Sequence, residues 1–439
     1  MMHNAVMQDS GVEWIGGIPH DWRKDKIFRL AEFISSGGTP TSTNEDFYGG
    51  DIMWVQTGDL DNDFIYESSK QITLEGLQSS SAKKFPKNTL LIAMYGATIG
   101  KLGILGVEAT TNQACCAVFV SLKMDIKFTF YLFMAMKDYL VFQSYGGGQP
   151  NISQEIIKQQ YVYYPPFSEQ QAIAQYLDQR CSKLDAIITI KQQQIKALDA
   201  LRQSIIYQAV TKGLDDTLPL VDSGVEWLGK IPQGWRVSKL KYITNQIVDG
   251  THFTPNYIER GVPFLRVTDI QTQSINFERI KFISEDEHTE LTKRAKPQRG
   301  DILLSKNGTI GITKIVDWDW EFSIFVSLCL IKLLPNISPY YFSYFFESDV
   351  VNKQLFESSK KTSVTNLHLV KIRELLLCVP PLLEQQRIVD HLDHETQRLN
   401  TLKENLNQQI STLQAYKKAL IYECVTGKKR INADALNAG

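Results

Sequence analysis

Two long stretches of the chain carry the apolar pattern of helices and contain neither glycine nor proline. The first runs over residues 168–211 and the second over residues 382–426, and a glycine closely follows each of them. A pair of prolines precedes both stretches, and Ser168 with Gln171 three residues later forms a capping-box signature. We therefore expect a helix of about 65 Å in each place, since a helix rises ~1.5 Å per residue.

Both helical stretches also carry a seven-residue apolar repeat, which is strictest in the second one. A helix that merely lies on a globular core does not need so strict a period, whereas a coiled coil does. Two such helices in one chain most simply pack on each other. Leu402 and Ile410 fall on the same side as the repeat. The predicted seam consists of Ile173, Leu177, Leu184, Ile188, Ile195, Leu198, Ile205, Ile388, Leu392, Leu399, Leu406, Leu413 and Leu420.

The chain also repeats itself outside the heptads. The segment Ser10–Trp22 recurs 213 residues later as Ser223–Trp235. The segment Pro165–Gln171 recurs 215 residues later, and that offset holds to the end of the helix. Between these anchors only fragments agree, such as Gly38-Thr39-Pro40 with Gly250-Thr251-His252. A period above two hundred residues is too long for a solenoid repeat and indicates a duplicated domain.

The remainder of each copy is rich in Gly, Thr, Tyr and Phe and holds short apolar runs such as Thr89–Tyr95 and Asp301–Ser305. Runs bounded by Pro and Gly are typical of strands in a mixed domain. Further helices are expected at Phe128–Phe142 and Tyr340–Leu355. We expect an α/β (α+β) chain with an internal pseudo-twofold duplication: a first domain at 1–166, a central helix at 167–213, a second domain at 214–381, a C-terminal helix at 382–430 and a tail at 431–439.

The composition fits a folded protein, with 43% hydrophobic and 22% charged residues among 439. A net charge of -1 excludes a histone-like polycation but not a local basic surface. The six cysteines show no metal or disulfide spacing. No signal peptide is visible, and the most apolar run, Phe322–Leu334, is too short to span a bilayer. We expect a soluble, cytoplasmic protein.

Catalytic signatures are present only in defective form. Gly96–Lys101 resembles a phosphate-binding loop but is one residue short and lacks the Ser or Thr that meets magnesium. Tyr164–Phe167 resembles an amino-methyltransferase motif, but Tyr164 replaces the Asn or Asp that grips the amine. His391 and His394 have a spacing that can ligate zinc, yet no Cys or further His accompanies them. We expect no catalytic centre, metal site or cofactor in this chain.

Two variable domains alternating with two repeated long helices resemble the DNA specificity subunit of type I restriction-modification systems. The resemblance covers the whole chain. In the motif Asp301–Gly311, the first copy has Leu90 where Asp301 stands in the second. The motifs that carry the resemblance are Trp14–Pro19 with its copy Trp227–Pro232, Pro165–Ile173 with its copy Pro380–Ile388, and Asp301–Gly311.

The resemblance implies a function without catalysis. Each variable domain would be a target-recognition domain that reads one half of a split, asymmetric sequence in double-stranded DNA. The helices would form an antiparallel coiled coil that sets the spacer and docks two modification subunits. Those methyltransferase subunits, and not this chain, would bind S-adenosylmethionine and methylate adenine N6. Restriction subunits with translocase and nuclease activity would join the complex through them.

The residues that would contact DNA follow from side-chain chemistry. Base edges favour Arg, Lys, Asn, Gln, Ser and Thr, and phosphates favour Lys and Arg. A solvated surface is the alternative for each lysine pair, and a turn that maintains the fold is the alternative for the shared Gly-Thr pairs. The candidates are Thr39, Thr57, Lys83, Lys84, Lys87, Tyr145, Gln149, Asn151, Thr251, His252, Arg266, Lys293, Arg294, Lys306, Asn307, Thr309, Lys360 and Lys361.

Two other functions remain open at this stage. A self-contained DNA methyltransferase or nuclease would bind S-adenosylmethionine or metal as the purified chain alone. A structural coiled-coil scaffold would show no sequence preference for DNA even when methylation partners are present.

Overall fold

The chain divides into two compact units. Unit 1 comprises Met1–Lys191 together with Gln408–Gly439, and unit 2 comprises Gln192–Asn407. Each unit therefore holds one of the two predicted domains together with parts of both predicted long helices. The computed structural model describes residues 6–144, 150–271, 274–356 and 367–431.

The elements of the first domain are, in chain order, β1 (Met7–Asp9), β2 (Gly17–Pro19), β3 (Arg23–Lys26), α1 (Ile27–Leu30), β4 (Ala31–Ser36), η1 (Glu45–Phe47), β5 (Tyr48–Val55), η2 (Thr57–Asp59), β6 (Phe64–Ile65), β7 (Gln71–Ile72), α2 (Leu74–Gln78), β8 (Lys84–Phe85), β9 (Leu90–Ala93), β10 (Leu102–Leu105), β11 (Ala109–Thr111), β12 (Cys115–Val120), α3 (Ile126–Gln143), α4 (Gln154–Gln159) and β13 (Tyr161–Tyr164). They form a five-stranded sheet of order β4-β12-β9-β10-β6, a four-stranded sheet of order β7-β5-β11-β8, and the ladders β1-β2 and β13-β3. α3 shares one apolar core with the five-stranded sheet.

The elements of the second domain are β14 (Leu220–Asp222), β15 (Lys230–Pro232), β16 (Arg236–Lys239), η3 (Leu240–Tyr242), β17 (Thr244–Asp249), β18 (Val262–Leu265), η4 (Val267–Asp269), β19 (Lys281–Ile283), α6 (Glu285–Thr292), β20 (Ile302–Ser305), β21 (Thr313–Ile315), β22 (Ser323–Ile324), β23 (Leu328–Leu333), α7 (Pro339–Glu347), α8 (Asp349–Phe356), α9 (Leu369–Glu374) and β24 (Leu376–Val379). Its sheets have the orders β17-β23-β20-β21 and β19-β18-β22, with the ladders β14-β15 and β16-β24. α7 packs on the four-stranded sheet within one core.

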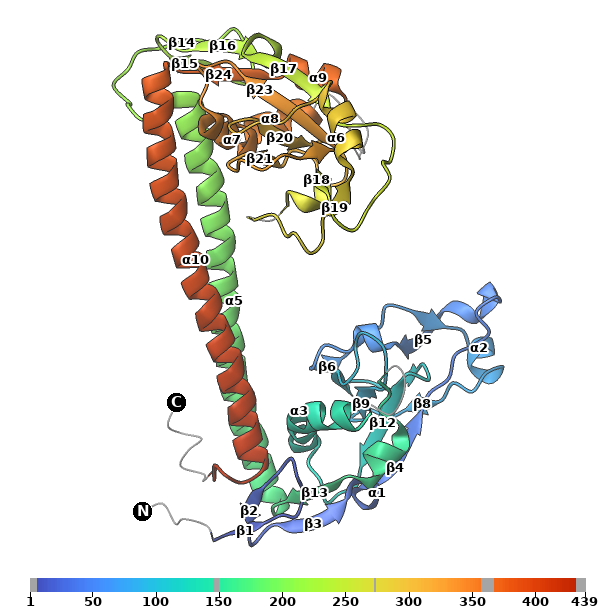
Figure 1. Cartoon of the computed structure of the whole chain (residues 1–439). Coiled ribbons are helices and arrows are strands. Elements are labelled where there is room, and N and C mark those ends of the chain that lie inside the picture. The colour runs from blue at the N-terminus through green and yellow to red at the C-terminus, as the bar shows by residue number, and fades with distance from the viewer. Residues whose placement is uncertain (1–5, 145–149, 272–273, 357–366, 432–439) are drawn as a thin grey trace. The chain divides into compact units, whose positions relative to one another are not determined.

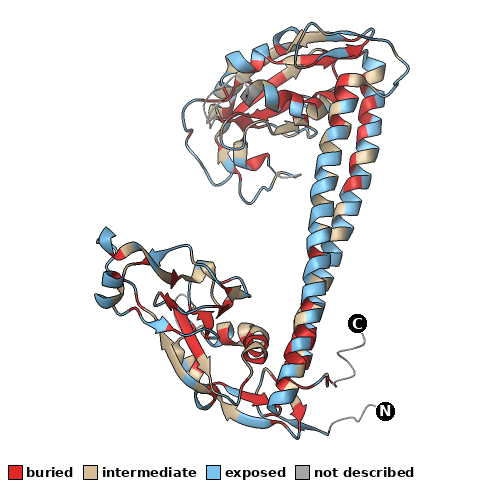
Figure 2. Ribbon diagram, turned by 180° about the vertical axis from the view of Figure 1, so that it is seen from behind, coloured by how far each residue is buried: buried red, intermediate tan, exposed pale blue. Residues whose placement is uncertain are grey.

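Two long helices complete the chain, α5 (Phe167–Lys212) and α10 (Leu382–Val425), with 46 and 44 residues. Within each unit they lie side by side (Figures 1 and 2). In unit 1, Asp185 forms an ion pair with Lys417 at 2.6 Å, and Lys191 donates a hydrogen bond to Gln409. Because the residue number rises on α5 as its partner's number falls on α10, the helices are antiparallel. This arrangement agrees with the predicted coiled coil.

None of the residues of the predicted seam is exposed, but several of the buried ones, such as Leu177 and Leu392, belong to the cores of the domains. Leu402 differs from the expectation, because 44% of it is exposed while Leu399 is only 3% exposed. Each leucine that is fully buried in such a seam contributes roughly 1.5–3 kcal/mol through removal of apolar area from water. Among the seam residues, the buried ones are Ile173, Leu177, Ile188, Ile388, Leu392, Leu399 and Leu420, and the half-buried ones are Leu184, Ile195, Leu198, Ile205, Leu406 and Leu413.

The C-terminal end of each long helix is buried in the core of a domain, and both helices are buried in the same way. In unit 1, Leu420 and Val425 of α10 belong to the same core as Trp22. In unit 2, Ile206 and Val210 of α5 belong to the same core as Trp235. Each unit is therefore completed by the helix end that arrives from the other copy of the repeat, which explains why both unit boundaries fall inside helices.

Two local expectations are corrected by the structure. The helix predicted at Tyr340–Leu355 is divided into α7 and α8 at Ser348, a buried residue whose hydroxyl donates to the carbonyl of Phe345. The capping box predicted at Ser168 does not form, because α5 already begins at Phe167, directly after the proline pair. In the described ranges, no helix is long and apolar enough to cross a membrane.

Candidate nucleic-acid interface

In each domain, four strand ends meet at one edge. In the second domain Asp249 at the end of β17 pairs with Cys329, and Ser305 at the end of β20 pairs with Leu328. β18 ends beside β22, which runs parallel to it and leads into the start of β23. We call the residues just beyond these strands, 249–252, 266–267, 305–307 and 325–327, the second strand-end edge.

The first domain has the same construction. Ser36 at the end of β4 pairs with Cys116, and Ala93 at the end of β9 pairs with Cys115. β5 ends beside the parallel strand β11, where Val55 pairs with Thr111. We call residues 36–39, 56–57, 94–97 and 112–114 the first strand-end edge.

At each edge, a glycine allows the segment after one strand to pass very close to the backbone of another strand. A Cβ added at Gly37 would lie 1.9 Å from the carbonyl oxygen of Thr111, and one added at Gly250 would lie 2.1 Å from that of Ile324. No other residue fits such an approach. Gly37, not Gly38, is thus the structural equivalent of Gly250, which shifts the sequence pairing by one residue.

Sequence-predicted candidates on the second edge have different environments. His252 is exposed, and its Nε2 lies 3.8 Å from the carboxylate of Asp249. Thr251 is buried. Arg266 directs its guanidinium to Asp269, with Nε 3.2 Å from Oδ2.

The remaining candidates of the second edge lie in the turn after β20. Lys306 is only 4% exposed, so its charge is not presented at the surface. The Asn307 side-chain oxygen is buried and finds no hydrogen-bond partner within the described part of the chain. Thr309 is exposed, and its carbonyl accepts a hydrogen bond from the Ser305 hydroxyl.

Candidates in the first domain are neutral at the edge and basic beside it. Thr39 is exposed and donates to the Gln113 side chain, and Thr57 opens η2 half-buried. Asn151 is exposed and forms an isolated bridge with Tyr95, in the segment that follows β9.

The predicted lysine clusters lie outside the residues of the two edges. Lys83 lies 3.3 Å from the Ser35 hydroxyl, Lys84 pairs with Glu108 at 2.9 Å, and Lys87 is exposed. At the end of α6, Lys293 pairs with Glu290 and Arg294 is exposed. Four further candidates lie outside the described residues: Tyr145, Gln149, Lys360 and Lys361.

Sequence reasoning missed a duplicated glutamine that joins each domain to its helix. Gln170, which is fully buried, donates to the carbonyl oxygens of Pro165 and Lys123 and accepts from the backbone N–H of Asp125 at 2.8 Å. Asp125 in turn caps α3 by accepting from the Phe128 N–H.

Gln385 makes the corresponding three bonds in unit 2. It donates to the carbonyl oxygens of Pro380 and Asn336 and accepts from the N–H of Ser338, the cap of α7. The signal available in the sequence was the Glu-Gln-Gln that both copies keep while the middle of the repeat diverges.

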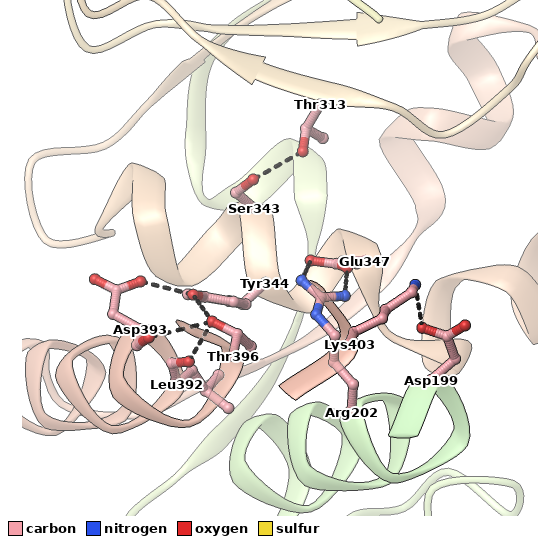
Figure 3. A network of polar contacts seen from close by, with 10 residues as sticks. All are labelled: Asp199, Arg202, Thr313, Ser343, Tyr344, Glu347, Leu392, Asp393, Thr396 and Lys403. Atoms are coloured by element: carbon pink, nitrogen blue, oxygen red, sulfur yellow. Dashed lines mark hydrogen bonds and ion pairs between the residues drawn. The ribbon is translucent and has the colours of Figure 1, made fainter. Parts of the chain in front are cut away.

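A tyrosine forms a second duplicated contact between each domain and its helix. Tyr131 of α3 donates to Asp178 of α5 at 2.7 Å, and Tyr344 of α7 donates to Asp393 of α10 at 2.6 Å. Figure 3 shows Tyr344 between Asp393 and Thr396. Burial, together with the Asp393 carboxylate, raises the pKa of Tyr344 to about 12.

In each unit an ion pair also joins the domain helix to the long-helix end that arrives from the other copy: Lys418 with Asp138 of α3 in unit 1, and Arg202 with Glu347 of α7 in unit 2. Arg202 of α5 forms a two-pronged ion pair with Glu347 of α7 (Figure 3). Partial burial lowers the pKa of Arg202. Contacts from both long helices therefore hold the second domain in its unit.

The cysteines and histidines show no reactive arrangement. All six thiols are buried. Burial raises the pKa of Cys116 to about 12 and that of Cys181 to about 11. Across the described ranges, no group of three or more His, Cys, Asp or Glu side chains is placed to hold a metal ion.

Comparisons with known proteins place this fold in a family. The family described as type I restriction modification DNA specificity domain matches residues 19–199 and again residues 232–412. The MjaIX specificity subunit of a type I restriction enzyme from Methanocaldococcus jannaschii is 26% identical over 429 residues, which cover 95% of each chain. The EcoBI specificity subunit from Escherichia coli is 23% identical over 288 residues, covering 63% of this chain and 60% of that one.

Two solved structures share the fold. One, described as the structural basis of complex assembly and conformational transition of the type I R-M system, has a TM-score of 0.73 at 16% identity and covers 94% of this chain and 99% of that one. The HsdS subunit from Thermoanaerobacter tengcongensis has a TM-score of 0.52 at 15% identity, covering 94% and 98%. The chain therefore belongs to the type I restriction modification DNA specificity family: it is a non-catalytic specificity subunit with two recognition domains, one in each half.

Proposed function

We propose that each recognition domain reads one half of an asymmetric bipartite DNA target, with the strand-end edge as the reading surface. The antiparallel coiled coil sets the spacer between the halves and docks two modification subunits. These subunits carry S-adenosylmethionine and methylate adenine N6, and restriction subunits join the complex through them.

The observation that carries this proposal is that the two strand-end edges share one backbone arrangement but present different side chains. Both edges are built from equivalent strand ends and an equivalent glycine crossing. The first edge presents neutral groups such as Thr39 and Gln113, whereas the second presents His252 and Arg266. A pseudo-twofold protein with unlike reading surfaces suits a two-part site whose halves differ.

Exposed apolar side chains on the helices support partner docking. In unit 1, Ile187 and Ile190 of α5 are 43% and 54% exposed. In unit 2, Leu201 of α5 and Leu402 of α10 are each 44% exposed. Apolar residues that a coiled coil leaves outside its own seam are suited to burial against another protein. DNA affinity shared with such partners also fits the net charge of -1.

Replacing the first domain tests the proposal. The chain with residues 11–166 exchanged for those of another family member is expressed with the modification subunits, and adenine methylation of the host genome is mapped. We expect one half of the methylated sequence to change and the other half to stay. A change in both halves, or in neither, would contradict separate reading by the two domains.

A further inference from the structure

A buried ion pair lies within the second strand-end edge. Lys306 Nζ lies 2.6 Å from Asp249 Oδ1, and only 5% and 7% of the two side chains are exposed. Asp249 ends β17, and Lys306 directly follows β20. Because β23 lies between these strands in the sheet, the pair joins two strand ends that are not neighbours.

The pair supports polar groups at the edge. The second carboxylate oxygen of Asp249 lies 3.8 Å from Nε2 of His252, whose side chain is 60% exposed. Asn307 follows Lys306, and its buried side-chain oxygen has no hydrogen-bond partner among the residues that the structure describes. The backbone of Lys306 is itself fixed, since its N–H donates to Ser327 and its carbonyl accepts from Leu367.

The first domain has the same backbone arrangement at these positions, but its side chains there are uncharged. Ser36 takes the place of Asp249, because each pairs with the equivalent cysteine, Cys116 or Cys329. Met94 takes the place of Lys306, since its N–H donates to Ala114 and its carbonyl accepts from Ile152 at 2.8 Å. The fold of a recognition domain therefore does not require an ion pair here.

Burial of two charges is a weak source of stability. Desolvation offsets most of the attraction, and well-packed neutral replacements are often neutral or stabilising. A buried pair that one domain has and the other lacks is better explained by what it holds in position.

We propose that Asp249 and Lys306 form a positioning pair for base recognition by the second domain, which rests on the proposed function. The pair fixes the turn that carries Asn307 and the imidazole of His252 at the edge, and these two side chains contact bases of the half-site read by this domain. The His252 imidazole supplies a donor and an acceptor for base edges, and the amide nitrogen of Asn307 supplies a further donor.

The test exchanges the pair for its counterparts in the first domain. The variant Asp249→Ser/Lys306→Met replaces the buried ion pair with the two neutral side chains that the first domain has at these positions. A matched control removes the ion pair between Asp301 and Lys332, which lies at the opposite end of the same strands. In the first domain Thr89 and Phe119 stand at those places, so the control is Asp301→Thr/Lys332→Phe.

Each variant is expressed with the modification subunits, and genomic adenine methylation is mapped. We expect Asp249→Ser/Lys306→Met to lose about tenfold or more of its discrimination at one or more bases of the second domain's half-site, with the other half unchanged. The control is expected to keep both halves. Unchanged discrimination in the Asp249→Ser/Lys306→Met chain would overturn the proposal.

The experiment also distinguishes two other outcomes: a general loss of activity in the double variant, and a failure of the proposed function itself. If the double variant loses all methylation, His252→Ala decides, because this exposed side chain is not needed for folding; an unaltered half-site in that variant would also overturn the proposal. If the unmodified chain directs methylation to no bipartite sequence, the proposed function fails, whatever the pair does.

Discussion

Gln170 and Gln385 show how the repeat preserves a contact rather than a surface. Each side chain replaces water around three backbone groups at the junction of a domain and its helix. The repeated Glu-Gln-Gln marks the place in the sequence, but it does not say which glutamine is buried. That depends on the residue at which the helix begins, and the helix begins at Phe167, two residues earlier than Ser168 as a capping residue would place it.

Truncating the first glutamine of the motif is expected to destabilise unit 1. Gln170→Ala leaves buried backbone groups without partners, which costs about 1–3 kcal/mol or more. The neighbouring Gln171 is exposed, so Gln171→Ala is the matched control, with an expected effect within about 0.5 kcal/mol. Urea unfolding of both variants checks this, and equal midpoints would show that the buried amide contributes nothing.

The raised pKa of Tyr344 predicts that the folded protein loses stability at high pH. Its pKa is raised to about 12 from 10.0, chiefly by burial, so the folded state keeps a proton that the unfolded state loses. The contribution of this group is complete below pH 10 and is lost as the pH rises towards 12. Tyr344→Phe should weaken this alkaline decline, at a cost of about 1 kcal/mol near neutrality for the lost hydrogen bond. Thermal unfolding from pH 8 to 12 measures both, and parallel profiles for the two proteins would contradict the assignment.

Lys306 marks the limit of prediction at the scale of single residues. Its sequence neighbourhood suggested a surface cation, but its partner Asp249 lies 57 residues away along the chain. Only the pairing of β17 and β20 with β23 brings the two groups together. The same strand pairing shows that Thr89, and not Leu90, stands where the second copy has Asp301, because Leu90 pairs with Val118 as Ile302 pairs with Ile331.

The long helices could be predicted from the sequence because a heptad repeat is a local signal. The break between α7 and α8 could not, because Ser348 ends α7 without the glycine or proline that usually marks a helix end. Heptad position alone also failed to separate Leu399 from Leu402, since burial depends on where the partner helix lies.

Leucine truncations on α10 test the seam directly. Leu399 is 3% exposed, so Leu399→Ala should destabilise unit 2 by about 2–5 kcal/mol through lost burial and a residual cavity. Leu402 is 44% exposed, and Leu402→Ala should change stability by less than about 1 kcal/mol. Thermal unfolding compares them, and a Leu402 variant as unstable as the Leu399 variant would place the seam on the wrong face.

At the scale of the whole molecule, the duplication was visible in the sequence, but the composition of the units was not. A linear reading divides the chain at the ends of its helices, whereas each compact unit takes a helix end from the other copy. Side chains such as Trp22 and Trp235, which receive those ends, are repeated in the sequence without any sign of their partners. The near-neutral composition fits the proposal that the chain binds DNA as one part of an assembly.

Methylation mapping of genomic DNA from cells that express this chain with its modification subunits tests the central claim most directly. The account predicts adenine methylation at a single asymmetric sequence made of two specified halves and an unspecified spacer of fixed length. A continuous or palindromic methylated sequence, or methylation without sequence preference, would contradict it.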